Sequence, residues 1–274
     1  MPIRGNNTRV KGPTKNRLSI KKHNSSKKKF EPVKVLLFVI PIIIVAVLAL
    51  GVWFAIKEYN KTMEIGNIKP SDIPIDSVQV VLTSEDYEKV LTVVSPSRKL
   101  PEDYNLDLEK YRGIYCDKLI IGSLEKMLND AKEQGINLIL TKGYISADEQ
   151  DKLYNDKVQE LLASGNFTIV KAEAEAKKTV PPGNYSENQT GLSVGISVDK
   201  DMSSSDFIST DAYKWLKINC VNYGFVIRYP ESKEEETDMV FDPMYYRFVG
   251  TDDAKKMRAL DMCLDEYSDY INSR

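Results

Sequence analysis

The chain is poor in histidine and cysteine. Its one histidine, His23, lies in a lysine-rich segment ahead of a long apolar run. Histidine is the commonest metal ligand and acid–base group in enzymes, and the chain beyond the apolar run has none. The three cysteines, Cys116, Cys220 and Cys263, are too widely spaced for a CxxC motif or a disulfide framework. We expect them to be small buried residues, with oxidation of one pair left open. A zinc site with nitrogen or sulfur ligands is therefore not expected.

One stretch lacks charge altogether. Residues 35–56 contain no Asp, Glu, Lys or Arg. As a helix rising ~1.5 Å per residue, this run is ~33 Å long and covers a bilayer core of ~30 Å. No small-residue cleavage site or lipidation cysteine follows it, which argues against a signal peptide. The sequence therefore predicts a transmembrane helix that stays in the chain.

The charges are divided between the two sides of this run. Residues 1–34 carry eleven Lys or Arg and one acid, a net charge of +10, so the chain total of −2 leaves −12 for the rest. Basic segments stay cytoplasmic, so we expect a single-pass protein of the cell membrane with an extracytoplasmic C-terminal domain. The basic tail is predicted to be disordered, and its charge is assigned to topology, so nucleic-acid binding is not expected. Residues 57–77 are predicted to be a linker, followed by one domain over 78–274.

Helix and strand signals alternate along that domain. It shows no internal repeat and no glycine-rich phosphate loop, which excludes the common nucleotide-binding motifs. Ser146 and Glu149 form a capping box, which predicts that a helix begins there. The mixed order predicts a single α+β domain. Further helices are predicted over 124–131, over 168–179, around 213–218 and from Thr251, and strands over 78–82, 136–140, 192–198 and 225–229 and as a pair through 240–241 and 246–249.

Ordered motifs join these elements. They are Leu91–Ser95, Leu100–Tyr104, Lys142–Ser146 with Gln150, Pro182–Gly183, Ser186–Val194, Trp215–Leu216, Tyr223–Phe225, Arg228–Pro230 and Asp242–Gly250. In this order they resemble the VanY-type D-alanyl-D-alanine carboxypeptidases over roughly residues 90 to 270. The resemblance implies the fold of that family and an extracytoplasmic zinc peptidase that trims the terminal D-alanine from peptidoglycan stem peptides.

The chain departs from the family at the residues that carry its chemistry. The family motif SEHQTGLAVD supplies a histidine and an aspartate to zinc, and Asn188 and Gly195 stand at those positions. The motif EPWH supplies the general base and a third ligand, which are Asp242 and Tyr245 here. The arginine of SGYRS, which holds the substrate carboxylate, is Ile145. We therefore expect no catalytic residue, no bound zinc and no enzymatic activity.

Three functions remain open. The first is a membrane-anchored binding or regulatory protein that contacts peptidoglycan stem peptides or a cell-wall enzyme. The second is an active carboxypeptidase with a non-standard site. The third is a structural partner of a wall enzyme with a vestigial pocket. If a peptide-binding cleft remains, recognition should favour the body of the stem peptide, because isoleucine cannot bind a carboxylate. The residues predicted to bind peptide are Tyr144, Gln150, Ser186, Asn188, Asp242 and Tyr245.

Overall fold

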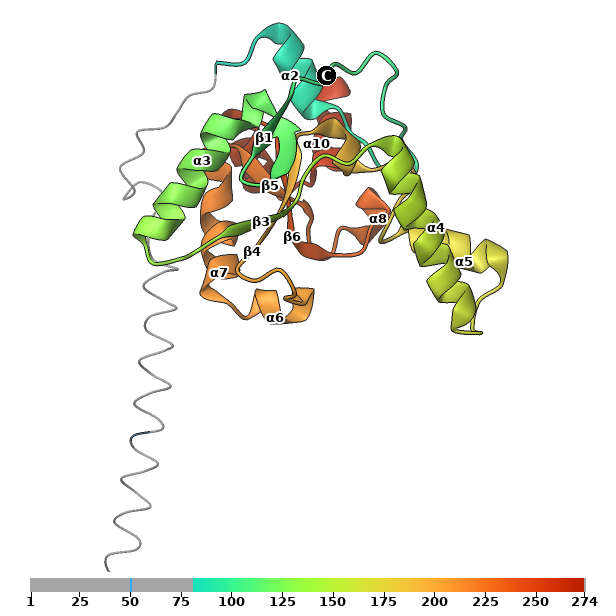
Figure 1. The fold of residues 1–274 in the computed structure, drawn as a ribbon. Helices are drawn as coiled ribbons and strands as arrows, with labels where there is room; N and C mark the ends of the chain where they lie inside the picture. The colour runs from blue at the N-terminus through green and yellow to red at the C-terminus, as the bar shows by residue number, and fades with distance from the viewer. Residues whose placement is uncertain (1–49, 51–80, 274) are drawn as a thin grey trace, which may run out of the picture. The chain divides into compact units, whose positions relative to one another are not determined.

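The computed structural model describes residue 50 and residues 81–273 (Figure 1). The predicted basic tail, linker and, apart from Leu50, transmembrane helix lie outside these residues. Within the described residues, no helix combines the length and apolar character needed to cross a bilayer. The predicted domain over 78–274 is described except for residues 78–80 and 274, so the account below concerns residues 81–273.

A four-stranded antiparallel sheet forms the centre of the domain. Its order is β3 (Ile139–Lys142), β4 (Ser193–Ser197), β6 (Asp242–Phe248) and β5 (Phe225–Tyr229). A separate hairpin pairs β1 (Leu108–Tyr111) with β2 (Ile114–Asp117). Its two-residue turn, Arg112 and Gly113, has positive φ at both positions, as tight hairpins favour. The domain is therefore mixed α+β, as predicted.

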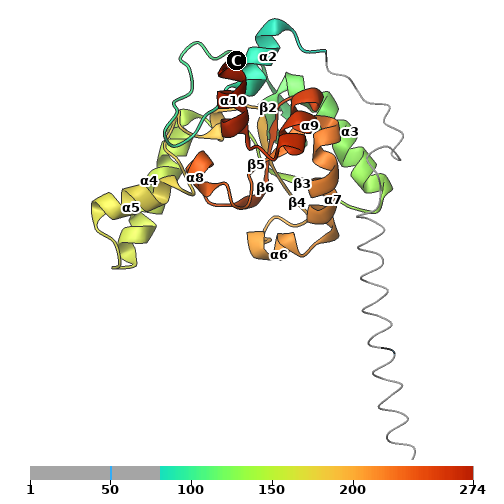
Figure 2. The same cartoon turned by 180° about the vertical axis from the view of Figure 1, so that it is seen from behind.

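Helices pack against the sheet to form one main core (Figures 1 and 2). The helical elements are α2 (Ser84–Leu91), α3 (Lys118–Glu133), α4 (Ala147–Ala163), α5 (Ile169–Lys177), η1 (Glu187–Thr190), α6 (Ser204–Ile208), α7 (Asp211–Asn219), η2 (Cys220–Tyr223), α8 (Glu234–Thr237), α9 (Thr251–Leu260) and α10 (Leu264–Asn272). Side chains of α3, α7, α9 and α10 share this core with those of β4, β5 and β6.

The two faces of the sheet have different roles. Val194 and Ile196 of β4, with Tyr246 and Phe248 of β6, are buried in the main core. Successive side chains of a strand point to opposite faces, so the residues between them face away from that core. Gly195 lies among those alternate positions, and its face is where the candidate site is found.

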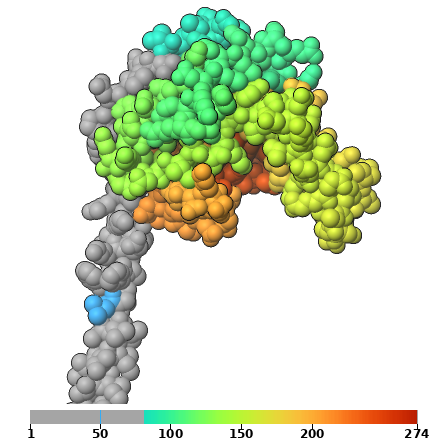
Figure 3. Space-filling view, in the orientation of Figure 1, coloured from blue at the N-terminus to red at the C-terminus, as the bar shows by residue number. Residues whose placement is uncertain are grey.

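Helices α4 and α5 form an arm beside this face. They pack on one another around a small core of Val158, Ala172 and Ala176, which is separate from the main core. In Figure 3 the arm projects from the domain, and the surface beside it is hollowed. The capping box predicted for α4 is present, since the Ser146 hydroxyl accepts from the Glu149 N–H and the Glu149 carboxylate accepts from the Ser146 N–H.

The structure confirms some predicted elements and corrects others. β5 has the predicted bounds, and the three cysteines are free and buried, as expected. The strand pair predicted through 240–249 is one strand, β6, because its partners are β4 and β5. Residues 81–82 are not a strand, and β3 begins at Ile139 rather than Ile136. The β1–β2 hairpin and α2 were not predicted.

Candidate functional site

A cleft lies between the arm and the face of the sheet that bears Gly195. Its cavity is about 280 Å³. Strands β3 and β6, the start of α4, the chain after α5 and the loop around η1 all contribute to its wall. The lining residues are Lys142, Ile145, Gln150, Leu153, Thr179, Val180, Pro181, Ser186, Asn188, Tyr229, Met239, Asp242 and Tyr245.

A chain of hydrogen bonds runs across the floor of the cleft. The Tyr245 hydroxyl donates to Asn188 Oδ1 at 2.5 Å, and Asn188 Nδ2 donates to Gln150 Oε1 at 2.7 Å. Gln150 Nε2 in turn donates to the Pro181 carbonyl at 2.7 Å. Each amide is thereby fixed in orientation, because its donor and its acceptor both have partners. Asn188 and Tyr245, which are 57 positions apart in the sequence, are thus in direct contact.

Burial keeps the Tyr245 hydroxyl protonated. Its side chain is 5% exposed, and removal from water raises its pKa well above the ordinary value of a tyrosine. The Tyr245 ring stacks on Tyr229, with ring centroids 5.6 Å apart and planes 3° from parallel. Burial also raises the pKa of Tyr229. Tyr245 therefore acts as a neutral hydrogen-bond donor with a fixed ring.

Gly195 lies between two strands that carry cleft residues. In the sheet register it is paired with Lys142 of β3 and with Tyr245 of β6. A Cβ atom at Gly195 would lie 2.6 Å from Thr141 Oγ1 and 2.9 Å from Lys142 Cβ, distances at which atoms must move apart. The close approach of β3 therefore requires glycine at this position, and any side chain here would displace β3.

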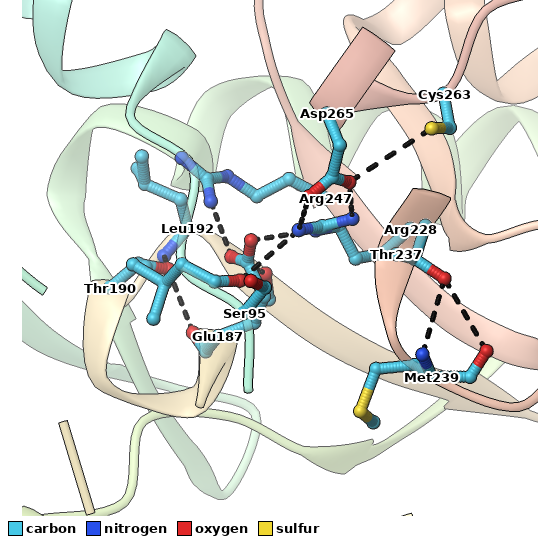
Figure 4. Close-up of polar contacts among 12 residues, drawn as sticks. Ser95, Glu187, Thr190, Leu192, Arg228, Thr237, Met239, Arg247, Cys263 and Asp265 are labelled. Atoms are coloured by element: carbon cyan, nitrogen blue, oxygen red, sulfur yellow. Dashed lines mark hydrogen bonds and ion pairs between the residues drawn. The ribbon is translucent and has the colours of Figure 1, made fainter. Parts of the chain in front are cut away.

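A buried ion cluster holds the loop that carries Asn188 (Figure 4). Glu187 is fully buried and binds two arginines: Arg228 Nε donates to its Oε1 at 2.6 Å, and Arg247 Nη1 donates to its Oε2. Arg228 also donates to Asp265 at 2.5 Å. Burial opposes ionisation of Glu187, but the two guanidinium groups outweigh it and lower its pKa. The carboxylate is therefore charged, and it fixes η1 relative to β5 and β6.

The structure brings most of the predicted peptide-binding residues together. Five of the six line the cleft, as does Ile145. The five are Gln150, Ser186, Asn188, Asp242 and Tyr245. Tyr144 does not line it. Its peptide N–H donates to the Tyr115 carbonyl of the β1–β2 hairpin at 2.7 Å. The role of all six residues in binding peptide stays a prediction.

Sequence reasoning did not select several residues of the cleft. Lys142 is part of a quoted motif, but its strand register with Gly195 depends on a contact more than fifty residues away. Tyr229 belongs to the motif Arg228–Pro230, but its stacking on Tyr245 joins two strands and has no local signal. No local pattern marks the wall residues of the arm. They are Leu153 of α4, then Thr179, Val180 and Pro181 from the chain after α5, and Met239 from the segment before β6.

The side chains at the matched metal positions do not form the donor set of a zinc site. Zinc takes histidine nitrogen, thiolate or carboxylate ligands. Position 188 offers an amide, position 195 no side chain, and position 245 a phenol that already donates to that amide. Within the part of the chain that the structure describes, no group of three or more His, Cys, Asp or Glu is placed to hold a metal ion. No catalytic step through zinc follows from these residues.

Known proteins share this fold and about a third of the aligned residues. The D-alanyl-D-alanine carboxypeptidase of Enterococcus faecalis is 33% identical over 184 residues, which cover 67% of this chain and 67% of the relative. A mutant of the vancomycin resistance D,D-pentapeptidase VanY from a VanB-type cassette, solved in complex with Zn(II), has a TM-score of 0.60 and 32% identity. The match covers 66% of this chain and 99% of that structure. VanYB in complex with D-alanine-D-alanine has a TM-score of 0.59 and 32% identity, covering 65% of this chain and 96% of that one.

These relatives contradict two predictions made from the sequence. The prediction that the chain is not an enzyme is wrong, because its relatives are carboxypeptidases and peptidases. The prediction that it lacks zinc is contradicted by the related structure in complex with Zn(II). Both predictions rested on the replaced ligands at three positions, on the changed general base and on the missing arginine. The side chains of this chain at positions 188, 195 and 245 do not fit the zinc ion of the related structure.

The family itself is established by the extent of the match. Residues 113–251 match the family described as VanY, D-alanyl-D-alanine carboxypeptidase. This range contains β3, β4, β5 and β6 and every residue that lines the cleft. The chain belongs to the VanY family of D-alanyl-D-alanine carboxypeptidases.

Proposed function

We propose that the domain binds peptidoglycan stem peptides that end in D-alanine, in the cleft beside the arm. We also propose that residues 35–56 anchor it in the cell membrane. One observation carries the ligand assignment. Ile145, Asn188, Asp242 and Tyr245, which the resemblance matches to the substrate and metal residues of the family, all line this cleft. The complex of the related VanYB with D-alanine-D-alanine supports the same class of ligand.

The walls of the cleft suit a peptide. Leu153 is 46% exposed on the arm and offers apolar contact. Asn188, Gln150 and Ser186 offer amide and hydroxyl groups, which match the polar atoms of a peptide backbone. Contact with a wall enzyme, the other partner expected from the sequence, stays a prediction.

Removal of the terminal D-alanine is the second candidate function, and the reaction of the relatives favours it. Asp242 is the one carboxylate among the residues that line the cleft. Its Oδ1 accepts from the Met244 N–H at 3.0 Å, which fixes the carboxylate at the start of β6. Asp242 is thus the candidate general base for this reaction.

Titration of the purified full chain with a muramyl pentapeptide ending in D-Ala-D-Ala tests the binding. We expect saturable binding, weakened at least about tenfold in Tyr245→Ala, because that change removes both the ring and the hydroxyl that fixes Asn188. Tyr115→Ala, on the exposed face of β2, is the control and should bind as the wild type does. Absence of saturation at millimolar peptide would refute the proposal.

A D-alanine release assay with added Zn(II) tests the second candidate. Release above a boiled control, lost in Asp242→Asn, would establish the carboxypeptidase activity and assign Asp242. Release that survives Asp242→Asn would exclude it as the base. Binding without release would leave peptide binding as the function of the cleft.

A further inference from the structure

The cleft contains a cation that stands at a different position from the family arginine. Lys142, the last residue of β3, lines the cleft together with Ile145, Asn188 and Tyr245. It is the one lysine or arginine among the lining residues. Its side chain is exposed, and within residues 81–273 it takes part in no ion pair or side-chain hydrogen bond. Its ammonium group is therefore available to a ligand.

The strand register places Lys142 beside the centre of the site. The pairing of β3 with β4 is irregular between Leu140 and Lys142, and such an irregularity re-aims a side chain. After it, Lys142 is paired with Gly195, which is paired with Tyr245 on its other side. Residues directly opposite each other in a sheet present their side chains on the same face. Lys142 and Tyr245 therefore flank Gly195 on the cleft face.

The missing side chain of Gly195 lets β3 approach β4 closely between these two residues. Adjacent strands are ~4.8 Å apart, so β3 and β6 are separated by ~10 Å across β4. The Lys142 Cβ lies 2.9 Å from where a Cβ at Gly195 would be, so the base of the lysine side chain lies against the glycine. Any side chain at position 195 would meet Thr141 Oγ1 at 2.6 Å as well as the Lys142 Cβ. Glycine at 195 thus allows the close approach of β3 that places Lys142 at the cleft.

We propose that Lys142 is the carboxylate receptor of this cleft and selects peptides with a free C-terminal carboxylate. The inference rests on the proposed binding of stem peptides. An ammonium group has three donors and no acceptor, which suits a carboxylate. Asn188 Nδ2 donates one hydrogen to Gln150 and has a second to offer the same ligand. Ile145, at the position matched to the family arginine, supplies apolar contact instead of charge.

The charges of Asp242 and Lys142 should have opposite effects on the binding of a free acid. Asp242, the carboxylate of the same cleft, repels an anion, so Lys142 must offset that repulsion as well as bind the ligand. Removing the charge of Asp242 should therefore strengthen binding of a free acid. Removing that of Lys142 should weaken it, and the effect of Lys142 should be absent for a peptide whose C-terminus is an amide.

Calorimetric titration of the full chain with two probes tests the inference. The probes are acetyl-L-Lys-D-Ala-D-Ala as the free acid and as the C-terminal amide. For the wild type we expect the acid to bind about tenfold tighter than the amide, the range of one charge-assisted hydrogen bond. Lys142→Gln should abolish this preference and leave amide binding unchanged, whereas Lys142→Arg should retain it. The matched control is Lys255→Gln, an exposed lysine on α9 that does not line the cleft.

The outcomes separate this inference from the proposed function. Equal binding of acid and amide to the wild type would overturn the role of Lys142 and leave peptide binding intact. A Lys142→Gln variant that loses acid and amide equally would show that Lys142 shapes the cleft rather than binding the carboxylate, and would also overturn it. No saturable binding of either probe would refute both proposals. In support of the inference, the preference for the acid should shrink as salt is raised, because the lysine is exposed.

Discussion

At the scale of single residues, the candidate site depends on the residue next to Asn188 as well as on its own polar groups. Asn188 is held by the residue before it, since Glu187 is buried between Arg228 and Arg247. Both arginines belong to the motifs in which the chain resembles the family. The structure assigns both of them to the ion cluster that fixes the loop, and neither lines the cleft.

Glu187→Gln should destabilise the fold. Removing one partner of a buried ion pair leaves the other charge uncompensated, a cost of about 3–5 kcal/mol in the free energy of unfolding. Urea denaturation of the full chain at pH 7 measures this change. Glu125→Gln, an exposed glutamate on α3, is the matched control and should lie within ~0.5 kcal/mol of the wild type. A variant as stable as this control would show that the cluster contributes nothing to stability.

The same residue gives the fold an acid-sensitive component. The pKa of Glu187 is lower in the folded chain than its ordinary value of 4.5, so the unfolded chain takes up the proton first. Its contribution to stability is therefore complete above about pH 4.5 and is lost as the pH falls through the folded pKa. The Glu187→Gln variant should show a shallower loss of stability over this acid range than the wild type. Parallel curves would contradict the assignment.

At the scale of elements, features set by local signals could be predicted from the sequence, whereas features set by long-range contacts could not. The start of α4 follows from Ser146 and Glu149, which are three residues apart, and β5 follows from one apolar run before an arginine. The position of Lys142 does not follow in this way. It depends on the register of β3 with β4, on the irregularity before Lys142 and on the close approach of Gly195, which belong to segments far apart in the sequence.

Gly195→Ala should test that close approach. The added methyl group would lie 2.6 Å from Thr141 Oγ1, so β3 must shift, at a cost of about 1–3 kcal/mol in unfolding free energy. Thermal and urea unfolding of the full chain measure it. In a Thr141→Ala background the same change should cost less, because the closest atom is gone, whereas Thr141→Ser keeps that atom and should give no relief. Unchanged stability of Gly195→Ala would mean that β3 is free to move.

At the scale of the whole chain, the distribution of charge and the proposed function both favour a C-terminal domain outside the membrane. The segment before the apolar run carries +10 and the remainder −12, and from the positive-inside rule we propose that the larger part is exported. A domain that binds peptidoglycan stem peptides must also lie outside the membrane, where that polymer is. This topology stays a prediction of the sequence, and the cleft is where we propose that such a ligand binds.

Protease treatment of intact protoplasts tests the topology. With residues 35–56 as the anchor, added protease should remove an epitope placed at the C-terminus, because the domain is outside. An epitope placed in residues 1–34 should persist until detergent opens the membrane, and this second epitope is the internal control for intact protoplasts. Replacing Lys27, Lys28 and Lys29 by glutamate lowers the charge of the tail by six and should raise the fraction of inverted chains, since orientation follows the excess of Lys and Arg. A C-terminal epitope that survives protease until detergent is added would refute both the orientation and the proposed access to stem peptides.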